Sequence, residues 1–114
     1  MIKIPVRVNE SMRVDLEKYI FNSGLYKYRV KFNGLASKII IDWLENPILD
    51  SNKMTYGKAE DPRTDKFTIF LSEEQYTKFR EIYSKKYSEE CRSPSPSILM
   101  YNIIKQFIEE KELD

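Results

Sequence analysis

The sequence is short of several residue types on which common functions depend. It contains no histidine and one cysteine, Cys91, so it lacks the usual zinc ligands, an internal disulfide and a histidine to activate the thiol as a nucleophile. Its three glycines form no phosphate-binding loop, and no serine nucleophile elbow is present. There is no apolar run of about 18 residues and no charged-then-apolar leader. These absences predict a cytoplasmic protein that is not an enzyme, binds no metal or cofactor and has no membrane partner.

The net charge of +1 is low for a nucleic-acid-binding domain, because such domains usually carry a marked basic excess. The charge is unevenly distributed, however. Residues 1–46 hold eight basic and five acidic side chains, a balance of +3, whereas four acidic residues gather at the extreme C-terminus. The first part of the chain is therefore the more basic one.

Two short stretches, residues 3–8 and 66–71, show the alternation of a strand with one buried face. The apolar face of the strands holds Ile4, Val6, Val8, Phe67, Ile69 and Leu71. The opposite face holds Lys3, Pro5, Arg7, Lys66, Thr68 and Phe70. Each stretch leads directly into a helical pattern, and the second faces of both strands are left free for a function.

Helix boundaries are marked by capping residues. Asn9 or Ser11 can cap the first helix, which should stop near Gly24, and Ser72-Glu73-Glu74-Gln75 is a capping-box sequence. The second helix is predicted to begin near Asn33-Gly34 and to be ended by Pro47. The last helix should have Ser95 as its cap and Pro96 in its first turn. The predicted apolar stripes of the four helices are Met12, Leu16, Tyr19 and Ile20; Leu35, Ala36, Ile39, Ile40, Trp43 and Leu44; Tyr76, Phe79, Ile82 and Tyr83; and Leu99, Met100, Ile103, Ile104, Phe107 and Ile108.

The order strand, helix, helix occurs twice, so the chain divides into residues 1–46, a linker at 47–65, and residues 66–114. The halves align with an offset of 63 through strand and first helix and of 64 in the second helix. Neither half can cover its own strand, whose backbone groups would stay unpaired on both edges. We therefore expect one co-folded unit, in which the strands form a two-stranded antiparallel ribbon and four helices interlock beneath it around a pseudo-two-fold axis.

The alternating strands, their immediate caps and the apolar second helices resemble the ribbon-helix-helix family of DNA-binding proteins, the Arc and MetJ type. The tandem arrangement is similar to that of the TraY-type accessory factors of plasmid transfer. The resemblance covers nearly everything except the linker. It implies a mainly α fold with a two-stranded antiparallel β-ribbon, in which a tandem ribbon-helix-helix chain forms an intramolecular pseudo-dimer.

The resemblance also implies that the ribbon reads base edges in the major groove. The positions that match the family's base-contacting residues are Lys3, Pro5, Arg7, Lys66, Thr68 and Phe70. Arg7 has the planar fork that suits a guanine edge. Pro5 and Phe70 depart from the family's polar pattern: Pro5 is tolerated only where its missing amide hydrogen faces away from the partner strand, and Phe70 suits a thymine methyl group or a sugar.

Phosphate contacts are implied at the N-terminus of each second helix, where free amides and the helix dipole favour an anion. The residues that match this place, together with nearby cations, are Lys27, Arg29, Lys31, Asn33, Gly34, Arg92, Ser95 and Ser97. Taken one at a time, these residues are equally typical of helix caps and solvated loops.

The expected function is sequence-specific binding of double-stranded DNA at an asymmetric site, as an accessory factor of conjugative plasmid transfer (a relaxosome component) or as a transcriptional regulator. Candidate partners besides DNA are further copies of the chain on repeated sites and a relaxase. The alternative is a ribbon-helix-helix scaffold used as a protein interaction module without specific DNA binding. The near-neutral charge, Pro5 and Phe70 motivate this alternative.

Overall fold

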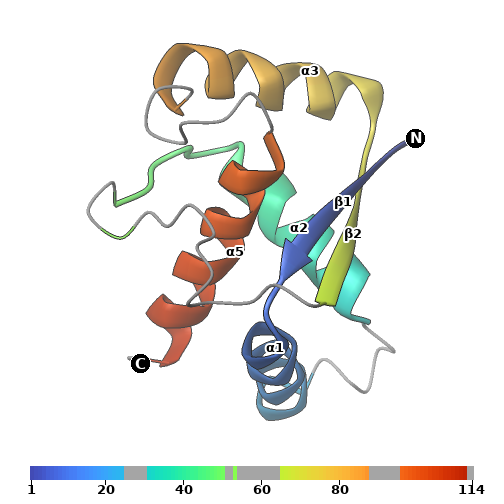
Figure 1. Cartoon of the computed structure of the whole chain (residues 1–114), viewed down its shortest axis with the longest axis vertical. Coiled ribbons are helices and arrows are strands. Elements are labelled where there is room, and N and C mark those ends of the chain that lie inside the picture. The colour runs from blue at the N-terminus through green and yellow to red at the C-terminus, as the bar shows by residue number, and fades with distance from the viewer. Residues whose placement is uncertain (25–30, 51–52, 54–64, 88–95, 113–114) are drawn as a thin grey trace.

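The computed structural model describes residues 1–24, 31–50, 53, 65–87 and 96–112. In this part of the chain, four helices, a π-helical turn and two strands form one assembly (Figure 1). The elements in chain order are β1 (Ile2–Val8), α1 (Glu10–Asn22), α2 (Phe32–Trp43), β2 (Asp65–Leu71), α3 (Glu73–Ile82), the π-turn η3 (Tyr83–Tyr87) and α5 (Pro96–Glu112). The prediction of a mainly helical fold with a two-stranded antiparallel ribbon is confirmed.

The ribbon is formed by one strand at the start of the chain and one from its middle. β1 and β2 pair antiparallel, with Ile4 opposite Ile69, Pro5 opposite Thr68 and Val6 opposite Phe67. The apolar face of the ribbon is almost completely buried, and Ile4 is the one partly buried member of its six residues. α2 lies along β2 and α5 lies along β1, while α1 and α3 follow the strands at opposite ends of the ribbon (Figure 1). Each strand is therefore covered by a helix that is distant from it in sequence.

The predicted start signals of α1 and α3 operate as expected. The Asn9 side chain accepts a hydrogen bond from the Met12 backbone N–H at 2.9 Å, and α1 is followed by Gly24 with a φ of 79°. Ser72 and Gln75 form the complete capping box of α3. α5 begins at Pro96, whereas its predicted cap, Ser95, lies outside the described residues.

Two predicted boundaries are wrong, and the predicted start of α2 is late by a single residue. α2 begins at Phe32, with Lys31 as N-cap, and it ends at Trp43, before the Pro47 that was expected to stop it. β2 begins at Asp65, a residue assigned to the linker, because pairing with β1 extends to the pair Val8 and Asp65. The π-turn that continues α3 was not predicted, and it buries Tyr87.

The core contains most of the predicted apolar stripes, with Tyr19, Tyr76, Ile82 and Phe107 only partly buried. Two polar side chains of the described segments are also buried. Ser37 donates to the Asn33 carbonyl at 2.7 Å, and Asn102 donates to the Ile98 carbonyl at 2.9 Å. Both hydrogen bonds connect residues four apart on the same helix, so these side chains keep a partner without water.

The first residues of the predicted linker are fixed to the helices. The Pro47 carbonyl accepts a hydrogen bond from the Tyr87 hydroxyl at 2.9 Å, and the Ile48 carbonyl accepts one from the Trp43 indole N–H at 3.3 Å. The Gln106 amide bonds both to the backbone N–H and to the carbonyl of Asp50, at 2.9 and 3.0 Å. Residues 47–50 therefore belong to the folded structure. None of the helices in the described segments is long and apolar enough to cross a membrane.

Candidate functional site

The candidate site is the outer face of the ribbon, defined as Lys3, Pro5, Arg7, Lys66, Thr68 and Phe70. These six side chains alternate with the buried ones along both strands, so they lie on the side of the ribbon opposite the core. Lys3, Pro5, Arg7 and Lys66 are exposed, and Thr68 and Phe70 are partly exposed. The structure thus brings all six predicted base-contacting residues onto one surface.

The register defines three pairs across this surface: Lys3 with Phe70, Pro5 with Thr68, and Arg7 with Lys66. The Thr68 N–H is donated to Asn33 Oδ1 at 3.0 Å, away from β1, so Pro5 and Thr68 form a non-hydrogen-bonded pair. The missing amide hydrogen of Pro5 therefore faces away from the partner strand, as the sequence predicted. Because pairs alternate along an antiparallel ladder, the other two outer pairs are also of the non-hydrogen-bonded kind, in which side chains lie closer together.

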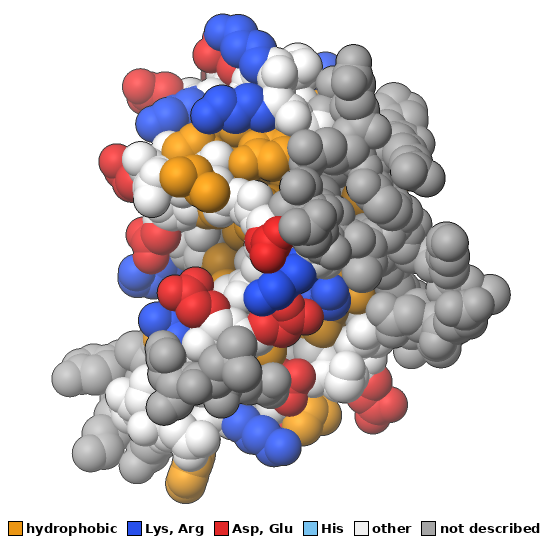
Figure 2. Space-filling model, turned by 90° about the vertical axis from the view of Figure 1, so that its left-hand side faces the viewer, with side chains coloured by type: hydrophobic (Ala, Val, Ile, Leu, Met, Phe, Trp, Pro, Cys, Tyr) orange, Lys and Arg blue, Asp and Glu red, His pale blue; other side chains and the backbone are white. Residues whose placement is uncertain are grey.

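The outer face carries positive charge that no carboxylate of the described residues balances. Lys3, Arg7 and Lys66 form no ion pair within the described residues, and none of the six outer residues is acidic. By contrast, Arg13, Lys38 and Lys105 each pair with a carboxylate. Figure 2 shows another side of the molecule, the left-hand side of Figure 1, on which Lys and Arg are interspersed with Asp and Glu. A surface of three unbalanced cations is suited to an anionic ligand.

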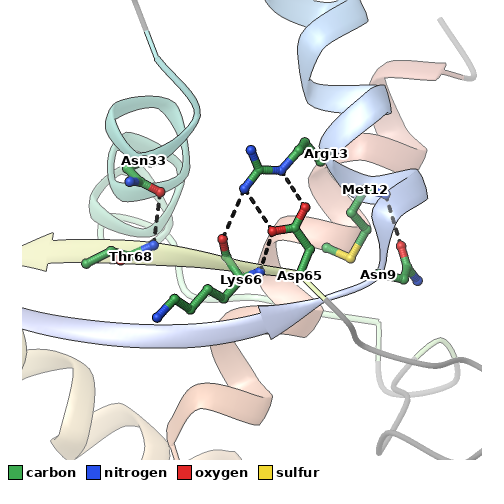
Figure 3. Close-up of polar contacts among 7 residues, drawn as sticks. All are labelled: Asn9, Met12, Arg13, Asn33, Asp65, Lys66 and Thr68. Atoms are coloured by element: carbon green, nitrogen blue, oxygen red, sulfur yellow. Dashed lines mark hydrogen bonds and ion pairs between the residues drawn. The ribbon is translucent and has the colours of Figure 1, made fainter.

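The first two turns of α2 are held against the free edge of β2. In addition to the contact of Asn33 with Thr68, the Phe70 N–H is donated to Ser37 Oγ at 2.9 Å. Figure 3 shows Asn33 reaching β2 from α2. The side-chain oxygen of Asn33, predicted to contact phosphate, is therefore used to satisfy the ribbon edge. The same contact places the N-terminus of α2 beside the outer face.

Two further predicted phosphate contacts, Lys31 and Gly34, are exposed at this N-terminus. Lys31 is the N-cap residue but makes no side-chain cap hydrogen bond, and a Cβ atom added to Gly34 would meet nothing within 4 Å. The first amides of a helix have no partner within the helix itself. The turn therefore offers backbone N–H groups next to an exposed cation, with no side chain at Gly34 to obstruct an approaching anion.

Of the remaining predicted phosphate contacts, one lies in the described residues. Ser97, in the first turn of α5, is partly buried. The other four, Lys27, Arg29, Arg92 and Ser95, lie outside the described residues. In the second half, Ser97 occupies the position that corresponds to Asn33. On β1 the counterpart of Thr68 is Pro5, which has no N–H to donate, so this edge needs no acceptor there.

A polar cluster that the sequence did not indicate fixes one end of the ribbon. The Arg13 Nη2 donates to Asp65 Oδ1 at 2.9 Å and to the Lys66 carbonyl at 3.4 Å (Figure 3). Arg13 Nε lies 2.6 Å from Asp65 Oδ2, an ion pair without hydrogen-bond alignment, and its guanidinium carbon lies 4.9 Å from the centre of the Phe32 ring. The Lys66 backbone N–H, and secondarily Arg13, lower the pKa of Asp65. The cluster ties α1 and α2 to the start of β2.

Asp65 lies next to Lys66 in sequence, but its side chain lies on the inner side of the ribbon. Because side chains alternate along a strand, its carboxylate faces Arg13, whereas Lys66 belongs to the outer face. The charge of Asp65 is therefore engaged by Arg13 and the Lys66 N–H. The Asp65 carboxylate therefore does not lie among the outer cations.

The described residues contain no group of His, Cys, Asp and Glu side chains that could hold a metal ion. No family model, curated protein or solved structure matches this chain. The case for a function therefore rests on the residues and their geometry.

Proposed function

We propose that the chain is a tandem ribbon-helix-helix protein that binds double-stranded DNA by placing the outer face of its ribbon in the major groove. The observation that carries this proposal is the outer face itself, which presents three cations on a two-stranded ribbon, none of them paired with a carboxylate of the described segments. The major groove is wide enough for such a ribbon.

The register of the ribbon supports an intramolecular pseudo-dimer. An offset of 63 residues takes Pro5 to Thr68, which is also its partner across the ribbon. The same offset takes Lys3 to Lys66 and Arg7 to Phe70, so exchanging the halves converts the pair Lys3 and Phe70 into the pair Lys66 and Arg7. A two-fold axis between Pro5 and Thr68 requires pairing that stays unchanged when the two halves are exchanged. The register of the ribbon has this property.

The second helices support the same arrangement. At an offset of 64, buried residues of α2 and its C-cap Leu44 correspond to buried residues of α5, in the pairs Leu35 and Leu99, Ala36 and Met100, Ile39 and Ile103, Ile40 and Ile104, and Leu44 and Ile108. α2 and α5 also contact one another. Equivalent faces of the two helices therefore meet in a shared core.

In the proposed complex, the outer cations supply the base contacts. Arginine and lysine donate to the O6 and N7 acceptors of guanine in the major groove, and threonine can hydrogen-bond a base or contact a thymine methyl group. The N-terminus of α2, with Lys31 and Gly34 exposed, would approach a phosphate beside the groove and fix the position of the ribbon. Base contacts then select the sequence and phosphate contacts set the register.

The proposed site is asymmetric, because corresponding outer positions of the two strands differ at Pro5 and Thr68 and at Arg7 and Phe70. An asymmetric site gives a bound protein one orientation. Such polarity suits an origin of transfer, and with the resemblance to TraY-type factors it favours a relaxosome accessory role, with repeated sites and a relaxase as further partners. A transcriptional regulator is the other form of this proposal.

The test is the binding of single-residue variants to a duplex that the wild-type protein selects. Arg7→Ala and Lys3→Ala should each weaken specific binding by about 1–3 kcal/mol, because each removes a base contact. Lys18→Ala removes the same charge from the exposed surface of α1 and serves as the control. Circular dichroism would show that all three variants are folded.

If both outer-face variants bind as tightly as Lys18→Ala, the outer face is not the DNA-binding surface. Failure of the wild-type protein to select any duplex would favour the protein interaction module instead. The surface to examine for a protein partner would then be the one that contains Pro5 and Phe70.

A further inference from the structure

The two ends of the outer face differ by a single residue type. One end carries Arg7 opposite Lys66, and the other carries Lys3 opposite Phe70. Because Lys3 and Lys66 are counterparts in the two halves, the lysine is common to both ends. The ends are therefore distinguished by Arg7 in one case and Phe70 in the other.

The Arg7 end is doubly cationic. Arg7 and Lys66 are both exposed and lie directly opposite in a close, non-hydrogen-bonded pair. Both are donors that suit the O6 and N7 acceptors of guanine, and neither can accept from the amino groups of adenine or cytosine. Two neighbouring G·C pairs would supply the guanine acceptors that this end requires.

The Phe70 end combines a cation with an apolar ring. The Phe70 backbone is held by its hydrogen bond to Ser37, and the ring is partly exposed on the outer face. Among the described residues, Phe70 is not one of the partly buried apolar side chains that pack against the core. The apolar feature of the major groove is the C5-methyl group of thymine, which phenylalanine can contact.

The distance between the two ends of the outer face can be compared with the rise of DNA per base pair. Residues 3 and 7 are four apart, a distance of about 13 Å along a strand, which is about four base pairs at 3.4 Å each. Resting on the proposed function, we infer that Arg7 and Phe70 set the polarity of the DNA site: neighbouring G·C pairs lie under Arg7 and Lys66, and a thymine lies under Phe70 about four base pairs away.

Base analogues in the duplex selected by the wild-type protein test this assignment directly. Replacing the thymine by deoxyuridine removes only the methyl group and should weaken binding about fourfold, as expected for one buried carbon. Replacing a guanine at the other end by 7-deazaguanine removes the N7 acceptor and should weaken binding at least about fivefold. Phe70→Arg should abolish the effect of deoxyuridine.

Reciprocal variants test whether the polarity depends on this one pair of residues. Phe70→Arg gives both ends Arg and Lys, so selection from a random duplex library should yield guanines at both ends of the site. Arg7→Phe gives both ends Lys and Phe and should yield thymines at both ends. In either variant the outer bases become palindromic, whereas those of the wild-type site are not.

The outcomes separate this inference from the proposed function. If the wild-type protein selects a motif but Phe70→Arg and Arg7→Phe select the same outer bases as the wild type, the assignment of the ends is wrong and DNA binding by the ribbon stands. If the wild-type protein selects no motif, the proposed function fails and the assignment fails with it.

Discussion

Arg7 and Lys66 face one another across the ribbon, an arrangement that reduces the stability of the free protein. Like charges directly opposite on neighbouring strands are destabilising, and no acidic residue shares the outer face. Arg13, close in space to the same end of the ribbon, is by contrast paired with Asp65. The proposed DNA ligand would supply the negative charge that this pair lacks among its described neighbours.

Replacing Lys66 by threonine should therefore stabilise the free protein while weakening DNA binding. Lys3→Thr is the matched control, since it makes the same change at the corresponding position, opposite Phe70 instead of a cation. We expect Lys66→Thr to raise the free energy of unfolding by a few tenths of a kcal/mol more than Lys3→Thr. Urea unfolding at low and high salt measures this, and the difference should shrink at high salt because the repulsion is screened. Equal effects of the two variants at low salt would show that the opposed charges do not interact.

At the scale of elements, α2 has two structural effects at the free edge of β2. Asn33 and Ser37 satisfy backbone N–H groups of β2, and this contact brings the exposed Gly34 beside the outer face. Glycine disfavours a helix, and a Cβ atom at this position would meet nothing. Packing within the described residues therefore does not explain Gly34, and the proposed phosphate contact is tested by adding a methyl group at this position.

Gly34→Ala should raise the free energy of unfolding by about 0.5 kcal/mol, because alanine has the higher helix propensity. The added methyl group should at the same time weaken DNA binding by obstructing the phosphate. Gly24→Ala is the contrasting variant, since the φ of 79° at Gly24 makes alanine strained there and should lower stability. Thermal unfolding and duplex titration of both proteins provide the measurements. Unchanged affinity in a stabilised Gly34→Ala protein would exclude the phosphate contact.

At the scale of the whole molecule, neither half of the chain covers its own strand. β1 is covered by α5, and β2 by α2, so each strand depends on a helix of the other half. The ribbon itself also joins the two halves, because β1 pairs only with β2 in the described structure. This dependence explains why the two halves of the chain share one core.

The features that could be predicted from sequence are those encoded locally. Alternation identified both strands and their outer faces, and the caps at Asn9 and Ser72 marked two helix starts. The contacts that were missed join residues distant in sequence. Arg13 and Asp65 are 52 positions apart, and Asn33 and Thr68 are 35 apart. On a helix surface Arg13 resembles any solvated residue, so its role becomes visible only when β2 is placed beside α1.

The most direct test of the whole account is selection of bound sequences from a random duplex library at near-physiological salt, followed by measurement of the affinity of the selected duplex against salt concentration. The account predicts an enriched, non-palindromic motif, with the logarithm of the binding constant falling by about 0.9 for each phosphate contact per tenfold rise in salt. A library that yields no enriched motif, with weak binding that disappears at modest salt, would contradict it.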